Sequence, residues 1–497
     1  MWTSSFSVGL YSMNKLKILA LVVCTLFCSE ITDAQNVVYS AYEKFDFRSG
    51  DFSVVGNIKG RLYAYRGSTE GFFLDAYDDS MQKTATVVLD FFPQKIYQAN
   101  FIAYTDHIIV LYQAIESNRV VQYAALLDET GRLKKGPIQL DEAKTGIFGA
   151  NKTYFSYAYS EDKKNIVVYS AGGKNGELVF NGKWIDDELN VINRSHAVFK
   201  TDNDLEAKDA ILSNEGYVYL PVHTPVGSKN YSDQAWLLCL QPGTTKFVAK
   251  ELPLNNMYAA GLYMKMDNVN KRVYAGGFYS SKKNGSFEGI LYAFYDITSA
   301  SFQNKKFLAF DPQLLGARSE RNKKRAFDDY VVRQIIVKND GGFVMVSESY
   351  FVSTRYSYAP GFGYYSSYYN PYMTSNVREY HYNDIMVLSY NAEGTREWGT
   401  LIPKTQYSQE DAGLFSSYAL LNTGGTLAFL FNDFNSSHSR IQMAAVDAQG
   451  KTDLRSFTAE GNDYPDWLPR SAKQIASRAM IVPCLHKRQI CFAKIVF

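Results

Sequence analysis

The sequence predicts an all-β protein, and three observations lead to that prediction. The 497 residues include 38 Tyr and 32 Phe but only 13 Pro, and aromatic and β-branched residues favour strands. A polar turn followed by a short apolar segment recurs along the chain. A second turn, of the form Asp/Asn-x-x-Gly, follows the third strand of several units. Together these features indicate repeated antiparallel meanders.

The clearest meander runs from Tyr330 to Lys404. Strands are expected at residues 331–337 and 342–347, and again at 384–390 and 395–401. A short polar turn joins the two strands of each pair, as expected for antiparallel neighbours. This unit therefore predicts a four-stranded sheet.

The same unit is expected eight times. The β-rich inner strand that follows each polar turn is expected at residues 59–65, 106–112, 164–169, 215–220, 271–276, 341–346, 424–430 and 478–482. Their spacing is near the ~40–50 residues of blade repeats. The prediction is one β-propeller domain of eight four-stranded blades, with seven blades as the alternative.

The Asp/Asn-x-x-Gly turn has a mechanical reason. It is found at residues 127–132, 390–395 and 446–451. The acidic or amide side chain caps the turn, and the glycine adopts the positive φ that closes it. Two markers in fixed order strengthen the repeat assignment.

The two ends of the chain are expected to meet. The last unit offers three strands, at 472–477, 479–482 and 489–496, and lacks a fourth. The segment 37–46 near the start reads as an unpaired strand. Pairing it with the last unit would close the ring and remove an exposed sheet edge.

Residues 1–34 read as a signal peptide. Lys15 and Lys17 precede the apolar run 18–27, and cleavage is expected after Ala34. Met13 is the expected start, with 1–12 as a non-native extension. The apolar run is shorter than the ~20 residues that span a bilayer. The mature domain, 35–497, is expected to be exported, to the periplasm or the cell surface, with no membrane span.

Charge and motifs narrow the function classes. Lys and Arg total 52 against 50 Asp and Glu, which disfavours nucleic acid as a partner. The six histidines show no paired spacing, so no metal site is expected. No phosphate loop, dinucleotide fingerprint or nucleophile elbow is present, and no cofactor is expected.

One blade carries a family resemblance. The stretch Val387–Trp398, Val-Leu-Ser-Tyr-Asn-Ala-Glu-Gly-Thr-Arg-Glu-Trp, resembles the blade signature of quinoprotein-type propellers and their non-enzymatic outer-membrane relatives. The resemblance implies that Trp398 docks its blade on the next one. The signal segment and the Tyr- and Asn-rich style also resemble uncharacterised exported propellers of Bacteroidetes-type bacteria.

A tyrosine-rich insertion, residues 350–382, interrupts the sixth blade. Tyr with Ser, Gly and Asn is typical of recognition loops. The candidate contact residues are Tyr364, Tyr365, Tyr368, Tyr369, Tyr372 and Arg355. The leading hypothesis is a monomeric, non-enzymatic binding or scaffold protein of the cell envelope, whose partner is an envelope protein or a glycan. A loop that packs on its own propeller face is the other interpretation.

The alternative function is a carbohydrate-active enzyme. Its candidate catalytic residues are Glu348, Asp384 and Asp411, because glycoside chemistry uses two carboxyl groups roughly 5–10 Å apart. Turn capping and contacts between blades explain the same residues. Whether the chain is an enzyme stays open at this stage, with the balance towards a binding protein.

Two cysteines flank the tip of a predicted hairpin. Cys484 and Cys491 have the spacing that places them opposite each other on adjacent strands. A disulfide, which an exported protein could keep, and two buried thiols both fit this pattern.

Overall fold

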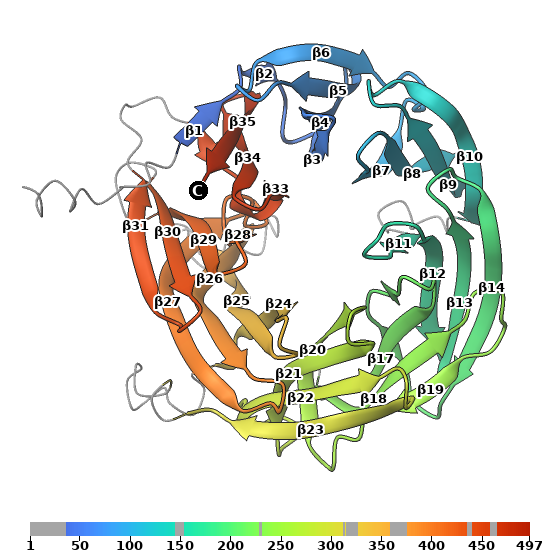
Figure 1. Cartoon of the computed structure of the whole chain (residues 1–497), viewed down its shortest axis with the longest axis vertical. Helices are drawn as coiled ribbons and strands as arrows, with labels where there is room; N and C mark the ends of the chain where they lie inside the picture. Colours follow the sequence, from blue (N-terminus) through green and yellow to red (C-terminus); the bar gives the residue numbers. More distant parts are fainter. Residues whose placement is uncertain are drawn as a thin grey trace, which may run out of the picture.

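The chain is all-β throughout the part that the structure describes. The computed structural model describes residues 36–144, 154–227, 231–311, 314, 327–357, 375–434, 440–457 and 465–497. Antiparallel sheets, most of them four-stranded, follow one another around a central opening (Figure 1). Among these residues, no helix has the length and apolar character needed to cross a membrane.

Five sheets in the described ranges have four strands each. Their strands are β3 (Asp51–Ile58), β4 (Arg61–Ser68), β5 (Gly71–Tyr77) and β6 (Lys83–Val88); β7 (Ile96–Ala103), β8 (Ile108–Glu116), β9 (Arg119–Leu127) and β10 (Leu133–Lys144); β11 (Ser156–Tyr159), β12 (Ile166–Lys174), β13 (Glu177–Ile185) and β14 (Val191–Lys200); β24 (Tyr330–Val337), β25 (Phe343–Ser357), β26 (Ser375–Tyr390) and β27 (Arg396–Gln409); and β28 (Ala419–Asn422), β29 (Thr426–Asp433), β30 (Arg440–Asp447) and β31 (Thr452–Phe457).

A nine-stranded sheet follows the third of these in the chain. Its strands are β15 (Glu206–Ala207), β16 (Ile211–Leu212), β17 (Val218–Val226), β18 (Tyr231–Leu240) and β19 (Val248–Glu251), then β20 (Tyr258–Asp267), β21 (Arg272–Ser280), β22 (Gly289–Asp296) and β23 (Ser301–Ala309). One paired position, Ser232 opposite Ala259, joins β18 to β20. The sheet is therefore two meanders linked at a single point.

The last sheet combines both ends of the described chain. It contains β32 (Asp466–Trp467), β33 (Lys473–Ala476), β34 (Ala479–His486) and β35 (Gln489–Val496), together with β1 (Asn36–Tyr39) and β2 (Glu43–Lys44). A 3-10 turn, η3 (Pro469–Ser471), lies between β32 and β33. β1 pairs with β35, with Asn36 opposite Val496. The predicted pairing of the first strand with the last is thus observed.

The repeat marker identifies a different strand from the one expected. The predicted inner strand 106–112 lies mostly in β8 and 271–276 in β21, which are the second strands of their meanders. In Figure 1 the strands nearest the opening are instead the preceding ones, such as β7 and β20. The second strand has neighbours on both edges and buries both faces, so its apolar run is the most continuous. This corrects the sequence assignment.

The predicted turns have the expected chemistry. Asp128 Oδ1 accepts hydrogen bonds from the backbone N–H groups of Thr130 and Arg132. Asp447 Oδ1 likewise accepts from the N–H of Lys451. The glycine of the first turn, Gly131, has a φ of +81°, a conformation that glycine adopts without strain. The capped turns are confirmed.

An aromatic hydrogen bond docks several sheets on the next. In each case a tyrosine hydroxyl or a tryptophan indole N–H donates to a backbone carbonyl in a turn of the following sheet. The pairs are Tyr63 Oη to Glu129 O (2.8 Å), Tyr104 Oη to Lys163 O (2.7 Å), Trp184 Nε1 to Gly216 O (2.8 Å), Tyr274 Oη to Gly341 O (2.8 Å) and Trp398 Nε1 to Ala448 O (2.9 Å). The docking role expected of Trp398 is therefore observed, but other sheets use other strands and other rings.

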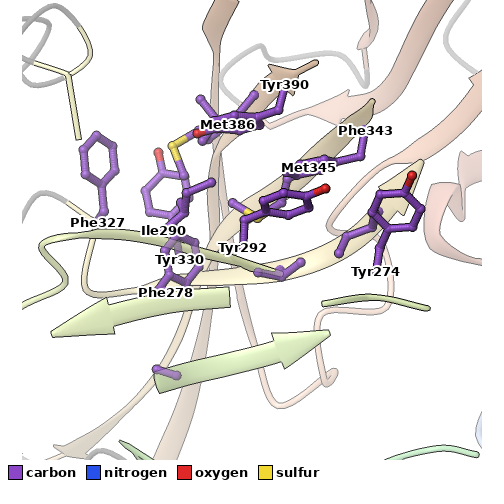
Figure 2. Packing of buried hydrophobic residues seen from close by; sticks show 14 of the residues in the cluster. Tyr274, Phe278, Ile290, Tyr292, Phe327, Tyr330, Phe343, Met345, Met386 and Tyr390 are labelled. Carbon is purple, nitrogen blue, oxygen red and sulfur yellow. The ribbon is translucent and has the colours of Figure 1, made fainter. Parts of the chain in front are cut away.

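The core lies between facing sheets. Figure 2 shows Tyr292 from β22 against Phe343 from β25, and Phe343 next to Tyr390 from β26. The ring centres of the first pair are 4.5 Å apart and those of the second 4.9 Å apart, with nearly parallel planes in both. Such stacks bury large apolar areas and add about 0.5–1.5 kcal/mol per pair. Aromatic residues thus hold neighbouring sheets face to face.

The two strands flanking the predicted tyrosine insertion are long. β25 has 15 residues and β26 has 16, and they remain paired from Phe343 opposite Tyr390 to Ser357 opposite Ser375. The insertion predicted at 350–382 therefore begins and ends as an extension of this hairpin.

Candidate functional site

The predicted contact residues fall largely outside the described residues. Tyr364, Tyr365, Tyr368, Tyr369 and Tyr372 all lie there. Arg355 belongs to β25, opposite Val377 of β26. Binding through these residues remains untested.

Glu348 is a buried carboxylate with a full set of partners. Its side chain is 0% exposed. Oε1 accepts a hydrogen bond from Lys404 Nζ at 2.9 Å. Oε2 accepts from Arg333 Nε at 3.0 Å and from Ser417 Oγ at 2.8 Å. Both oxygens are therefore used in holding β24, β25, β27 and the segment before β28 together.

Lys404 completes this arrangement. Its ammonium donates to Glu348, to the carbonyl of Tyr382 at 3.1 Å and to Gln406 Oε1 at 2.9 Å. These three acceptors match its three N–H donors. Burial lowers the pKa of Lys404, and the Glu348 charge opposes that effect. We call Arg333, Glu348, Tyr382, Lys404, Gln406 and Ser417 the Glu348 cluster.

The other two predicted acids also have partners. Asp411 Oδ1 accepts from Ser408 Oγ at 2.6 Å and from the N–H of Gly413 at 2.8 Å. Asp384 Oδ1 accepts from the backbone N–H of Lys404 at 3.2 Å. These are capping contacts, which was the other interpretation of these residues.

A spacious cavity lies elsewhere, between strands that face the central opening. A cavity of about 830 Å³ is lined by parts of β7, β11, β16 and β20, with contributions from β8, β9 and β17. We call it the channel cavity. Figure 1 shows β7, β11 and β20 around the opening. Glu348, Asp384 and Asp411 do not line it.

Amide and phenol groups line much of this cavity. Gln98 and Asn100 project from β7, and Tyr157 and Tyr159 from β11. The two tyrosines are two positions apart on a strand and therefore share one face. Their ring centres are 6.4 Å apart with planes inclined by 17°. The rings form an aromatic strip on the cavity wall.

Charged residues add the reactive groups. Lys208, Asp209, Lys265 and Glu161 line the channel cavity. Glu161 Oε2 accepts a hydrogen bond from Asn268 at 2.9 Å. Within the described part of the chain, the side chains of Lys208, Asp209 and Lys265 form no salt bridge or hydrogen bond. They are also exposed, so they are accessible to a ligand.

Tyr263 brings a protonated phenol to the same site. It lies on β20 and lines the cavity. Burial raises its pKa above the ordinary value of a tyrosine, and the charge of Asp209 raises it further. Tyr263 therefore keeps its proton at neutral pH, in the cavity that Asp209 also lines.

No metal centre is found in the ranges that the structure describes, since no three His, Cys, Asp or Glu residues are placed to share an ion.

Cys484 and Cys491 lie directly opposite each other on β34 and β35. Both are buried and carry free thiols. Burial raises the pKa of Cys484, and the neighbouring Cys491 adds to it.

Sequence reasoning did not find the channel cavity. Its lining residues come from segments between Gln98 and Asn268 and share no motif. A usable signal was the polar and aromatic content of strands that lead into the apolar repeat marker, as in Ser156–Tyr159. Those strands were not recognised as the ones facing the opening.

Comparison with known proteins gives distant structural matches. No family model and no curated protein matches the sequence. A polysaccharide lyase, Uly1, matches over 94% of both chains with 11% identity and a TM-score of 0.39. A PL25 ulvan lyase matches over 79% of this chain and 90% of its own, with 10% identity and a TM-score of 0.37.

Prolyl oligopeptidase B from Galerina marginata also matches, over 88% of this chain and 56% of its own, with 10% identity and a TM-score of 0.42. The chain thus spans a little over half the length of that peptidase. These matched proteins are enzymes, which contradicts the expected non-enzymatic binding or scaffold role. The resemblances to quinoprotein-type and Bacteroidetes-type propellers are unsupported.

Proposed function

We propose that this chain is a carbohydrate-active enzyme whose substrate occupies the channel cavity. The proposal rests on the cavity's own side chains. The observation that carries it is a set of accessible charged groups, Lys208, Asp209 and Lys265, that have no partner among the described residues and lie in one cavity with an aromatic strip.

The size and lining of the cavity suit a glycan. Its volume of about 830 Å³ is within the ~300–1,000 Å³ typical of ligand sites. Sugars present hydroxyl groups at their edges and C–H groups on their faces. The amides of Gln98 and Asn100 can bond the hydroxyls, and the rings of Tyr157 and Tyr159 can pack on the faces.

Asp209 is the residue to which we assign proton transfer. It is a carboxylate that lines the cavity and has no side-chain partner among the described residues. Glu161 is a second carboxylate that lines the same cavity. Glycoside chemistry uses two carboxyl groups. Tyr263 holds a proton next to Asp209 and can donate a hydrogen bond to the substrate.

The proposal extends to architecture and location. The sheets are those of an eight-bladed propeller, counting the nine-stranded sheet as two blades, and the β1–β35 pairing closes the ring. The chain is exported after removal of residues 1–34 and acts as a monomer on a glycan.

The test is an activity screen on polysaccharides with one informative variant. Reducing ends report hydrolysis, and ultraviolet absorbance of unsaturated ends reports elimination. Asp209→Asn should lower kcat by at least about 100-fold, the scale of general acid–base catalysis. Asp204→Asn, a nearby exposed residue outside the cavity, is the matched control. Activity that survives Asp209→Asn unchanged would remove Asp209 from the chemistry; a screen with no turnover of any glycan would refute the function.

A further inference from the structure

Two lysines from distant parts of the chain donate hydrogen bonds to neighbouring strands. Lys163 follows β11, and its Nζ donates to the carbonyl of Ala103 at the end of β7, at 2.7 Å. Lys473 begins β33, and its Nζ donates to the carbonyl of Val55 on β3, at 2.8 Å. We call them the lysine pair.

The two acceptor strands touch each other. A Cβ atom placed on Gly56, next to Val55, would lie 3.1 Å from the Cβ of Ala103. The two ammonium groups are therefore bound to adjacent strands. Burial lowers the pKa of Lys473, and the charge of Lys163 lowers it further. The two positive charges thus repel each other.

Neither ammonium group uses its full donor capacity. An ammonium has three N–H donors, and each lysine has one hydrogen-bond acceptor within the described ranges. No salt bridge forms at either residue there. Lys163 has in addition the ring of Tyr104, whose centre is 5.8 Å from its Nζ.

The acids nearest in sequence are engaged elsewhere. Glu161 accepts from Asn268, and Asp162 Oδ1 accepts from Ser160 Oγ at 2.6 Å. Two like charges without a counterion are unfavourable, and a bound anion would satisfy the unused donors through charge-assisted hydrogen bonds. Lys473 as a whole residue is exposed, although burial around its ammonium lowers its pKa; an anion would approach from the exposed side of the residue.

We propose that Lys163 and Lys473 form an anion site that binds the carboxylate or sulfate group of an acidic glycan. This rests on the proposed function, because the turn that carries Lys163 also carries Glu161, which lines the channel cavity. The substrate class is therefore an acidic polysaccharide, recognised by its charged group at the lysine pair and by its sugar rings in the cavity.

The test compares acidic and neutral oligosaccharides by calorimetric titration. The probes are tetrasaccharides of galacturonate, mannuronate and sulfated galactose, then neutral cellotetraose, and inorganic sulfate. Lys163→Met and Lys473→Met should each weaken binding of at least one acidic probe by about tenfold or more. Cellotetraose binding should stay unchanged, and sulfate should compete with the acidic probe. Lys164→Met, an exposed neighbour, is the matched control.

The outcomes separate this inference from the proposed function. Turnover of neutral glycans with no preference for acidic ones would overturn the inference and leave the enzyme proposal standing. Sulfate binding without competition against any acidic tetrasaccharide would mark a site for free anions and overturn the glycan assignment. If the wild-type protein turned over none of the glycans, the proposed function itself would be rejected.

Melting temperatures test whether Lys163 and Lys473 have a purely structural role. Without anion, the Lys163→Met/Lys473→Met double variant should melt at or above the wild-type temperature, because removing both charges relieves their repulsion. Sulfate should raise the melting temperature of the wild type more than that of the double variant. A double variant that melts lower and binds acidic probes normally would show that the lysines only clamp β3 and β7.

Discussion

The Glu348 cluster and the channel cavity contain similar side chains in opposite states. Both gather carboxylates, lysines, amides and tyrosines. In the cluster, Glu348 and Lys404 use every oxygen and N–H on one another and their neighbours. In the cavity, Asp209 and Lys208 have no side-chain partner among the described residues. The comparison teaches that residue type alone does not mark a site, whereas an accessible charge without a partner does.

The largest expected effect tests the cluster. Glu348→Gln leaves the Lys404 ammonium buried without its counterion, and breaking a buried pair in this way costs about 3–5 kcal/mol. The free energy of unfolding from urea titration should fall by that amount. Replacing both Glu348 and Lys404 by leucine should cost less, because no fully buried charge remains; Arg333 loses its Glu348 partner, but its side chain is 32% exposed. If Glu348→Gln unfolded like the wild type, the cluster would not be a structural element.

An exposed ion pair tests whether pairing alone stabilises the fold as strongly as the buried Glu348 cluster does. Lys338 Nζ lies 2.6 Å from Glu397 Oε2, and the Glu397 side chain is 38% exposed. The pKa of Glu397 is lowered by the hydrogen bond from Lys338 and then by that from Ser389. Its contribution is thus fully present above the ordinary carboxyl pKa near 4.3 and is lost as the pH falls through the lower folded-state value.

Glu397→Gln should therefore lower the free energy of unfolding by about 0.5 kcal/mol at pH 7, as for exposed pairs. The difference from wild type should vanish at acidic pH, where both proteins lack the charge. Urea titrations at pH 7 and below pH 3 measure it. A difference that persists at the acidic pH would assign the effect to packing.

The smallest effect on stability is expected in the channel cavity. Lys208→Met and Asp209→Asn remove exposed charges that have no partner in the described part of the chain, so each should change the free energy of unfolding by less than about 0.5 kcal/mol. Thermal melts of both variants check this. A loss of about 2 kcal/mol or more would show that these residues are structural and would end the contrast between the two regions.

The sheets were predictable because their information is local. Capped turns such as Asp128–Gly131 and apolar runs such as Ile108–Glu116 fix strand pairs within a few tens of residues. The same signal predicted the wrong strand at the opening: it identifies the second strand of each meander, whereas the first strand faces the opening. The apolar run marks the strand buried on both faces, whereas the first strand, which faces the opening, mixes buried and half-buried residues.

The site was not predictable for a related reason. Asp209 and Tyr159 line one cavity only because separate meanders surround the same space. Lys163 and Lys473 are brought together by the return of the chain to its own beginning. No spacing in the sequence encodes such contacts. Glu348 was a reasonable acid candidate. Its partner Arg333 lies on the paired strand β24, but Ser417 comes from the segment before the next sheet.

The hydrogen bonds that dock one sheet on the next have a consequence for sequence divergence. The donor is a ring, such as Trp398 or Tyr63, whereas the acceptor is a backbone carbonyl in the neighbouring turn. Any residue supplies a carbonyl. A turn can therefore change nearly all its side chains and still receive its neighbour, provided that its length and its glycine are kept. Repeats built in this way can lose their common sequence while the assembly of the sheets is inherited intact.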